Sequence, residues 1–142
     1  MTLRIEEQEK RVANILSATS KKDLQKAPNT VRTYQRYLEA NIEYPCLLTG
    51  VEDFPWEERY VFGYGDPEEY EELKKTRASY RDIFQLIAFE EWGEGDEVII
   101  AKVKRKHDNK KFSIRLDWLE ATERATQNYQ LLDDYTFWYV NY

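Results

Sequence analysis

The sequence of 142 residues contains one cysteine and one histidine, and each scarcity excludes a class of site. With Cys46 alone, neither an internal disulfide nor a thiolate zinc centre can form. A Cys46–His107 dyad would be a nucleophilic pair, but a buried structural thiol and an exposed turn histidine are much commoner. We therefore predict that the protein is not an enzyme.

Long apolar runs and glycine-rich phosphate loops are also missing. No stretch approaches the roughly 20 apolar residues that cross a bilayer, and Met1 to Glu9 carries four charged residues, which is unlike a signal peptide. Gly63-Tyr64-Gly65 lacks the spacing of a dinucleotide-binding or P-loop motif. These absences predict a cytoplasmic protein that does not use a membrane.

Negative charge is present in excess, and it is unevenly distributed along the chain. The net charge is −6. Residues 1–42 hold eight basic and five acidic residues, residues 43–97 hold five and sixteen, and residues 98–142 hold eight and six. The balances are +3, −11 and +2. Because nucleic acid requires positive charge, the middle segment argues against a nucleic-acid partner and favours a cation or a basic protein surface.

Hydrophobic periodicity predicts an α+β fold in a single domain spanning residues 1–142. Apolar residues at helical spacing predict helices over about 3–17 and from Pro28 to Ile42, which together form an N-terminal helical arm over 1–42. Residues 43–142 are rich in β-branched and aromatic residues. We expect them to form a small, strongly bent antiparallel sheet or an SH3-like barrel.

Short apolar runs place the expected strands. They are Cys46–Leu48, Tyr60–Phe62, Ile83–Phe89, Val98–Val103, the stretch containing Phe112 and Ile114, and a final buried strand over Tyr135–Val140. His107 to Lys110 predicts a hairpin turn, because Asp and Asn tolerate tight-turn backbone angles. Trp118 to Arg124 is expected to form a short helical turn.

Carboxylates are the strongest chemical feature of the chain, and they occur in three groups. The groups are Glu52, Asp53, Glu57 and Glu58; Asp66, Glu68, Glu69, Glu71 and Glu72; and Glu90, Glu91, Glu94, Asp96 and Glu97. Calcium takes six to eight oxygen ligands, and a bound cation relieves repulsion among unpaired carboxylates. Since no EF-hand spacing is present, a calcium site would be irregular or spread over several loops.

Two of these groups also have a structural interpretation. Asp66 can cap a helix that begins at Pro67, with acids in its first turn and Glu71 facing Lys75. The third group is consistent with a solvated loop. The first group lacks a comparable explanation, because Arg59 is the only basic residue beside it.

Paired carboxylates can also hydrolyse glycosides, and Trp56 and Trp92 could stack on a sugar ring. That chemistry needs one buried acid with a raised pKa opposite an ionised one, in a deep cleft. A chain this short and this densely charged makes such a cleft a poor interpretation.

Four sequence blocks resemble a known family. The blocks are Tyr44-Pro45-Cys46-Leu47-Leu48-Thr49-Gly50, Asp53-Phe54-Pro55-Trp56-Glu57-Glu58-Arg59-Tyr60, Glu69-Tyr70-Glu71-Glu72-Leu73-Lys74-Lys75 and Leu131-Leu132-Asp133-Asp134-Tyr135. They are similar to the small cyanobacterial-type calcium-binding proteins (the CcbP-like family). The likeness covers most of the chain from Tyr44 onward. Ala78 and Arg81 depart from it, since a proline and a threonine are expected there, and Arg81 adds a positive charge beside the acids.

The resemblance implies a calcium buffer or sequestering protein with a compact β-barrel-like fold and a negatively charged surface. It carries over only the acids inside the matching blocks, which are Asp53, Glu57, Glu58, Glu69, Glu71, Glu72, Asp133 and Asp134.

Together, charge and resemblance predict a non-EF-hand protein whose ligand and cofactor is Ca²⁺. The candidate metal ligands are Glu52, Asp53, Glu57, Glu58, Asp66, Glu69, Glu71, Glu72, Asp133 and Asp134. The alternative is an SH3-like interaction module in which exposed aromatic rings and an acidic rim bind a basic or proline-rich protein partner. A third, weaker hypothesis is a DNA mimic whose acids imitate phosphates.

Overall fold

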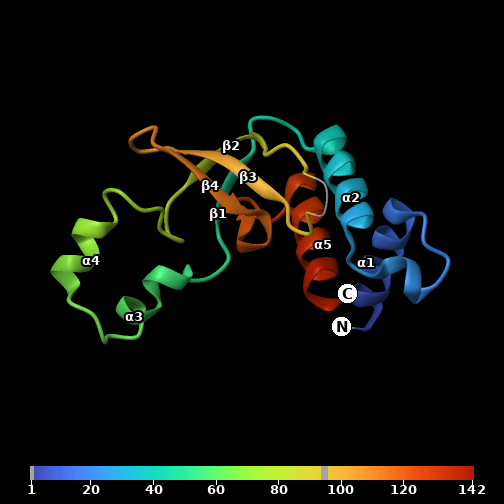
Figure 1. Ribbon diagram of the computed structural model, residues 1–142, viewed down its shortest axis with the longest axis horizontal. Coiled ribbons are helices and arrows are strands. Elements are labelled where there is room, and N and C mark those ends of the chain that lie inside the picture. Colours follow the sequence, from blue (N-terminus) through green and yellow to red (C-terminus); the bar gives the residue numbers. More distant parts are fainter. Residues whose placement is uncertain (1, 94–95) are drawn as a thin grey trace.

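The computed structural model describes residues 2–93 and 96–142, and it confirms the α+β class. The described residues form five α-helices and one five-stranded antiparallel sheet (Figure 1). The helices are α1 (Thr2–Leu16), α2 (Pro28–Asn41), α3 (Glu58–Val61), α4 (Pro67–Leu73) and α5 (Gln127–Asn141). The strands are β1 (Leu47–Gly50), β2 (Phe84–Phe89), β3 (Ile100–Arg105), β4 (Lys111–Arg115) and β5 (Leu119–Ala121).

The elements are arranged in three parts along the longest axis of the molecule. Figure 1 shows α1, α2 and α5 at one end, the sheet in the middle, and α3 with α4 at the other end. Both chain termini lie at the end formed by α1, α2 and α5. Helix α5 packs on β5, and α1 packs on both α2 and α5. The part of the acidic middle segment that contains α3 and α4 is therefore separated in space from the three long helices.

The sheet is open, with the strand order β4-β3-β2-β1-β5. Leu48 of β1 is paired with Phe84 of β2 on one side and with Ala121 of β5 on the other. Strands β4 and β5 form its two edges, so the sheet does not close within the described residues. Of the two predicted alternatives, the antiparallel sheet is confirmed and the barrel is wrong. A β-bulge interrupts the pairing of β2 with β3 between Leu86 and Ala88.

The hydrophobic core is continuous from the inner face of the sheet into the three long helices. Alternating side chains of β2 and β3, such as Phe84, Leu86 and Val103, are buried on this face. Between the helices, the rings of Tyr34 and Trp138 stack with centroids 5.0 Å apart. Each large ring that is buried removes about 150–250 Å² from water, so these rings contribute strongly to the stability of the core.

The largest disagreement with the sequence prediction is at the C-terminus, where Tyr135–Val140 belongs to helix α5 rather than to a strand. Thr126 caps this helix, because its Oγ1 accepts a hydrogen bond from the Tyr129 backbone N–H at 3.2 Å. Helix α5 packs against β5 and α1, so its apolar residues are not confined to one stripe. A run of apolar and aromatic residues with no helical period looks like a buried strand.

Two shorter segments also differ from expectation. Tyr60 and Val61 lie in helix α3 and not in a strand. The expected helical turn over Trp118–Arg124 is a 3₁₀ turn that ends at Trp118 and is followed by strand β5. The hairpin turn between β3 and β4 is confirmed, and Asn109 adopts the left-handed backbone conformation there, with φ of 61°.

Candidate functional site

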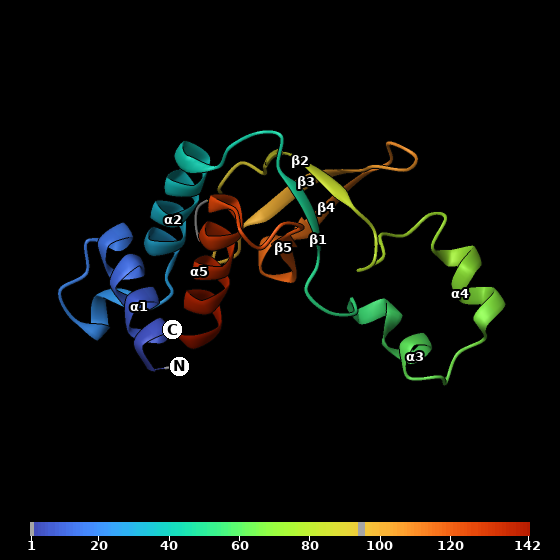
Figure 2. The same cartoon turned by 180° about the vertical axis from the view of Figure 1, so that it is seen from behind.

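The connection between β1 and β2 forms a projecting lobe that carries ten of the 27 acidic residues. We call residues 51–83 the acidic lobe; it contains the 3₁₀ turn η2 (Pro55–Glu57), α3 and α4. Figure 2 shows it extending away from the sheet on the side opposite the three long helices. Its first part, residues 51–73, holds nine acidic residues and one basic residue, a balance of −8.

The carboxylate of Glu57 holds the base of the acidic lobe together. Its side chain is fully buried. One oxygen accepts hydrogen bonds from the Phe54 and Tyr80 backbone N–H groups, at 3.2 and 2.9 Å. The other accepts from Tyr70 Oη at 2.9 Å and from Ser79 Oγ at 2.5 Å. Four donors compensate the cost of burying this charge, so Glu57 acts as a structural anion.

Aromatic rings connect the two short helices of the lobe. The rings of Tyr60 in α3 and Tyr70 in α4 stack with centroids 4.9 Å apart and an interplanar angle of 5°. Tyr60 Oη donates a hydrogen bond to Glu69 at 2.5 Å. Burial, followed by the hydrogen bond to Glu57, raises the pKa of Tyr70 to about 12. These contacts fix helices that would be too short to be stable alone.

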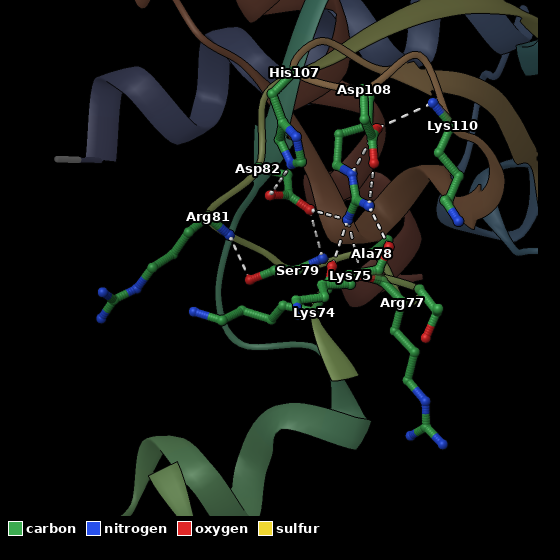
Figure 3. Close-up of polar contacts among 12 residues, drawn as sticks. Lys74, Lys75, Arg77, Ala78, Ser79, Arg81, Asp82, His107, Asp108 and Lys110 are labelled. Carbon is green, nitrogen blue, oxygen red and sulfur yellow. Dashed lines mark hydrogen bonds and ion pairs between the residues drawn. The ribbon is translucent and has the colours of Figure 1, made fainter. Parts of the chain in front are cut away.

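Arg105 attaches the end of the lobe to the sheet. Its partners, which include Asp82, Asp108 and Lys75, lie close together in Figure 3. Its guanidinium group is fully buried and donates hydrogen bonds to the carboxylates of Asp82 and Asp108. It also donates to three backbone carbonyls just after α4, those of Lys74, Lys75 and Arg77, at 2.9–3.0 Å. The hydrogen bonds from Arg105 hold the pKa of Asp108 well below its ordinary value.

A close backbone approach completes the attachment. Gly50 at the end of β1 donates a backbone hydrogen bond to the Tyr80 carbonyl at 2.9 Å. A Cβ atom at position 50 would lie 2.5 Å from Tyr80 Cβ and 2.6 Å from its Cα. Glycine is therefore required where the two ends of the lobe meet.

A groove lies between the base of the lobe and the sheet, with a volume of about 450 Å³. Aromatic residues from both sides line it, including Phe54, Trp56, Phe112 and Trp118. Trp56 Nε1 donates to the Ala78 carbonyl at 2.8 Å, which fixes the indole at the groove wall. We call this feature the aromatic groove. The sequence prediction of exposed aromatic rings did not locate it, because its walls are far apart in the chain.

The predicted ligands on α4 have local structural roles. Asp66 caps the helix by accepting the Glu68 backbone N–H at 3.1 Å, as expected. Glu71 and Glu72 form ion pairs with Lys74 and Lys75 at 2.8 and 2.9 Å. Glu71 therefore pairs three residues along the helix, and the expected contact with Lys75 is replaced by one from Glu72.

Asp133 and Asp134 lie on α5, at the opposite end of the molecule from the lobe (Figure 1). Asp134 is buried and accepts two hydrogen bonds from the Arg11 guanidinium, at 2.7 and 3.0 Å. Asp133 accepts a hydrogen bond from Gln8 Nε2 at 3.1 Å. The fold does not bring these two acids to the other predicted ligands.

Three predicted ligands on the lobe have carboxylates for which the described residues provide no hydrogen-bond or ion-pair partner: Glu52, Asp53 and Glu58. Glu52 and Glu58 are exposed, and Asp53 is half-buried. Within residues 2–93 and 96–142, no three His, Cys, Asp or Glu side chains are grouped closely enough to hold a metal ion. Of the third acidic group, Glu94 lies outside the described residues.

Burial of Cys46 raises the pKa of its thiol to about 11, which makes it a poor nucleophile. His107 is exposed in the β3–β4 turn, 3.8 Å from the Asp82 carboxylate.

In the described part of the chain, no helix is long and apolar enough to cross a membrane. Comparison with protein-family models, with curated proteins and with solved structures found no match.

Proposed function

We propose that the protein binds calcium ions through the acidic lobe and acts as a cytoplasmic calcium buffer or sequestering protein. The observation that carries this proposal is the −8 balance of residues 51–73 on a segment that projects into solvent. The resemblance of the blocks around Asp53–Tyr60 and Glu69–Lys75 to small calcium-binding proteins supports it. Carboxylate oxygens are the ligands that calcium prefers.

The proposed ligands are Glu52, Asp53 and Glu58, whose carboxylates are not engaged within the described residues. They lie before and after the turn that Glu57 holds in place, so Glu57 positions the site and does not contact the ion. Backbone carbonyls and water would supply the remaining oxygen ligands. Within the described residues these three carboxylates are not grouped closely enough to coordinate one ion together, so each would be a separate ligand of a loosely held ion. We therefore expect a dissociation constant of about 10⁻⁴–10⁻³ M.

Calorimetric titration with calcium at physiological salt tests the proposal. The triple variant Glu52→Gln, Asp53→Asn, Glu58→Gln should lose the binding heat and the calcium-dependent rise in melting temperature. The matched control replaces three exposed acids outside the lobe: Glu6→Gln, Glu39→Gln and Glu123→Gln. It should bind as the wild type does. Absence of heat and of any melting shift at millimolar calcium would refute the proposal.

The aromatic groove favours a second function, recognition of a proline-rich segment of a protein partner. Such segments adopt an extended helix that presents flat apolar faces, and grooves lined by aromatic rings bind them at low entropic cost. Arg77 lines the groove with its guanidinium 5.5 Å from the Trp56 ring centroid, so a polar donor lies next to the apolar wall. The open sheet means that this groove differs from that of a closed SH3 barrel.

Proton–nitrogen NMR of the tryptophan indoles tests this second function. A proline-rich peptide should shift the indole signals of Trp56 and Trp118, which line the groove. Thr76→Arg would fill the groove from its exposed rim and should abolish the shifts, whereas Thr33→Arg on α2 should not. Unchanged indole signals in the wild-type protein at millimolar peptide would exclude this function.

A further inference from the structure

The outer face of the sheet carries positive charge without matching negative charge. Residues 98–117, which include β3 and β4, hold seven basic residues and two acidic residues, a balance of +5. The two acidic residues, Asp108 and Asp117, pair with Arg105 and Arg115, so the remaining positive charge is that of five lysines. Lys102 and Lys104 alternate with buried residues, and Lys111 is the cross-strand partner of Lys104, so all three lie on the face away from the core. We call this surface the lysine face.

Two features of the lysine face are unfavourable in the isolated molecule. Lys104 and Lys111 are direct cross-strand neighbours, and like charges in that position destabilise a sheet. Ile87 occupies the extra position of the β-bulge in β2 and is 44% exposed. A shallow hollow of about 270 Å³ lies here, lined by Ile87, Lys102 and Lys111 among others. Negative charge on a partner would offset the repulsion between Lys104 and Lys111, and apolar groups on the same partner would cover the exposed Ile87.

The face is not purely basic. The Glu90 carboxylate lies at one end, where it accepts a hydrogen bond from Ser113 Oγ at 2.6 Å. Lys102 and Lys111 remain exposed, and no carboxylate partner is found for them among the described residues. Their positive charge is therefore available to a second molecule.

The complementary surface is present on the same chain, at the far end of the acidic lobe. The connection between α3 and α4 exposes Phe62 and Tyr64, whose exposed fractions are 62% and 85%. Gly63 between them has a φ of 83°, which allows the tight turn that displays both rings. Glu58 and Asp66 flank the turn in sequence, and Arg59 is the one basic residue among residues 58–66, which leaves a balance of −1. We call residues 58–66 the lobe tip.

We propose that the lobe tip of one copy of this chain docks on the lysine face of a second copy. The exposed rings of Phe62 and Tyr64 would cover Ile87, and the acids beside them would face Lys102 and Lys111. A second copy fits better than an unrelated polyanion, because the lobe tip offers the apolar rings that the exposed Ile87 requires, in addition to negative charge.

This contact is head-to-tail, because the two surfaces are different parts of the chain. Both views place the α3–α4 connection far from the sheet of its own chain, so the two surfaces cannot meet within one molecule (Figures 1 and 2). A heterologous contact of this kind builds a ring if the rotation closes and an open chain if it does not. Its ionic component makes the association weaker at high salt.

Sedimentation equilibrium over a protein concentration series, in EDTA, tests the proposal independently of calcium binding. At low salt the mean mass should rise with concentration, and at high salt it should return towards the monomer mass. Lys102→Glu with Lys111→Glu, and separately Phe62→Ser with Tyr64→Ser, should each raise the apparent dissociation constant by about tenfold or more. Lys21→Glu with Lys22→Glu, on the exposed turn after α1, should have no such effect.

A mixture of the two double variants provides the decisive measurement. Each keeps one intact surface, so an equimolar mixture should form a heterodimer that grows no further, while either variant alone stays monomeric. A wild-type protein that remains monomeric at all concentrations at low salt would overturn the proposal. Association that persists unchanged in both double variants, when circular dichroism shows that both fold, would also overturn the proposal.

Discussion

Ser79 Oγ donates a hydrogen bond of 2.5 Å to Glu57 Oε1, joining two residues that are 22 positions apart. Both side chains are buried at the base of the acidic lobe. The contact ties the turn after β1 to the segment before β2, so it fixes where the lobe leaves the sheet. Three other donors bind the same carboxylate, so this contact is one of four hydrogen bonds that hold the base of the lobe together.

Replacing Glu57 by glutamine should destabilise the lobe. The NH₂ group of the glutamine would face hydrogen-bond donors at a position where Glu57 supplies an accepting oxygen. At least one buried donor would then be left unsatisfied. Such a loss costs about 1–3 kcal/mol. Chemical denaturation followed by far-ultraviolet circular dichroism measures the change. Glu58→Gln, one residue later on an exposed side chain, is the control and should change stability by less than about 0.5 kcal/mol. Equal stability of the two variants would contradict a structural role for Glu57.

Replacing Arg105 by methionine should release the segment after α4. The change leaves Asp82, Asp108 and three backbone carbonyls without the donor that Arg105 supplies, and a buried acceptor left unsatisfied costs about 1–3 kcal/mol. Amide hydrogen exchange should accelerate around residues 74–77 more than in β1. Lys104→Met, one position earlier in β3, is the control; uniform exchange rates across both regions in Arg105→Met would contradict a local role.

Asp108 should make stability depend on acid pH. The hydrogen bonds from Arg105 lower its pKa in the folded protein, so its stabilising contribution is complete above the ordinary aspartate pKa of about 4. That contribution is lost as the pH falls through the lowered folded value. The difference in melting temperature between wild type and Asp108→Asn should therefore be largest near pH 7 and narrow below about pH 4. A difference that stays constant from pH 7 to pH 2 would be the contrary result.

Gly50→Ala tests the close approach of β1 to Tyr80. The added methyl group would overlap backbone and Cβ atoms of Tyr80, which cannot move aside as a flexible side chain could. Overpacking of this kind costs about 1–3 kcal/mol, measurable by thermal or denaturant unfolding. Gly63→Ala meets no neighbouring atom, so its cost comes from the positive φ alone, about 1 kcal/mol. A smaller effect at position 50 than at position 63 would show that the approach tolerates a side chain.

Local sequence signals predicted the parts of the fold whose structure is set locally. The expected helices near the N-terminus correspond to α1 and α2, because their apolar residues recur with a helical period. The cap at Asp66 and the turn at Asn109 depend on neighbouring residues alone, and both were predicted. Helix α5 was missed because its neighbours, and not its own pattern, determine that several sides are buried.

The candidate site was also predicted only in part from the sequence. Charge counting located the acidic lobe, but it could not separate the buried Glu57 from the exposed Glu58. The donors to Glu57 include Tyr70 and Tyr80, 13 and 23 residues further along the chain. Arg105 was missed although the sequence contains a signal: it shares the alternation of Ala101 and Val103, which face the core.

Because β1 and β2 are directly paired neighbours, the whole segment from 51 to 83 is an insertion at a hairpin connection. A two-residue turn could close the same pair of strands. The order of the strands therefore does not depend on the length of the lobe. For the same reason the lobe is a segment that could be grafted between paired strands of another protein, provided that its glycine, its buried glutamate and the arginine from the neighbouring hairpin are transferred with it.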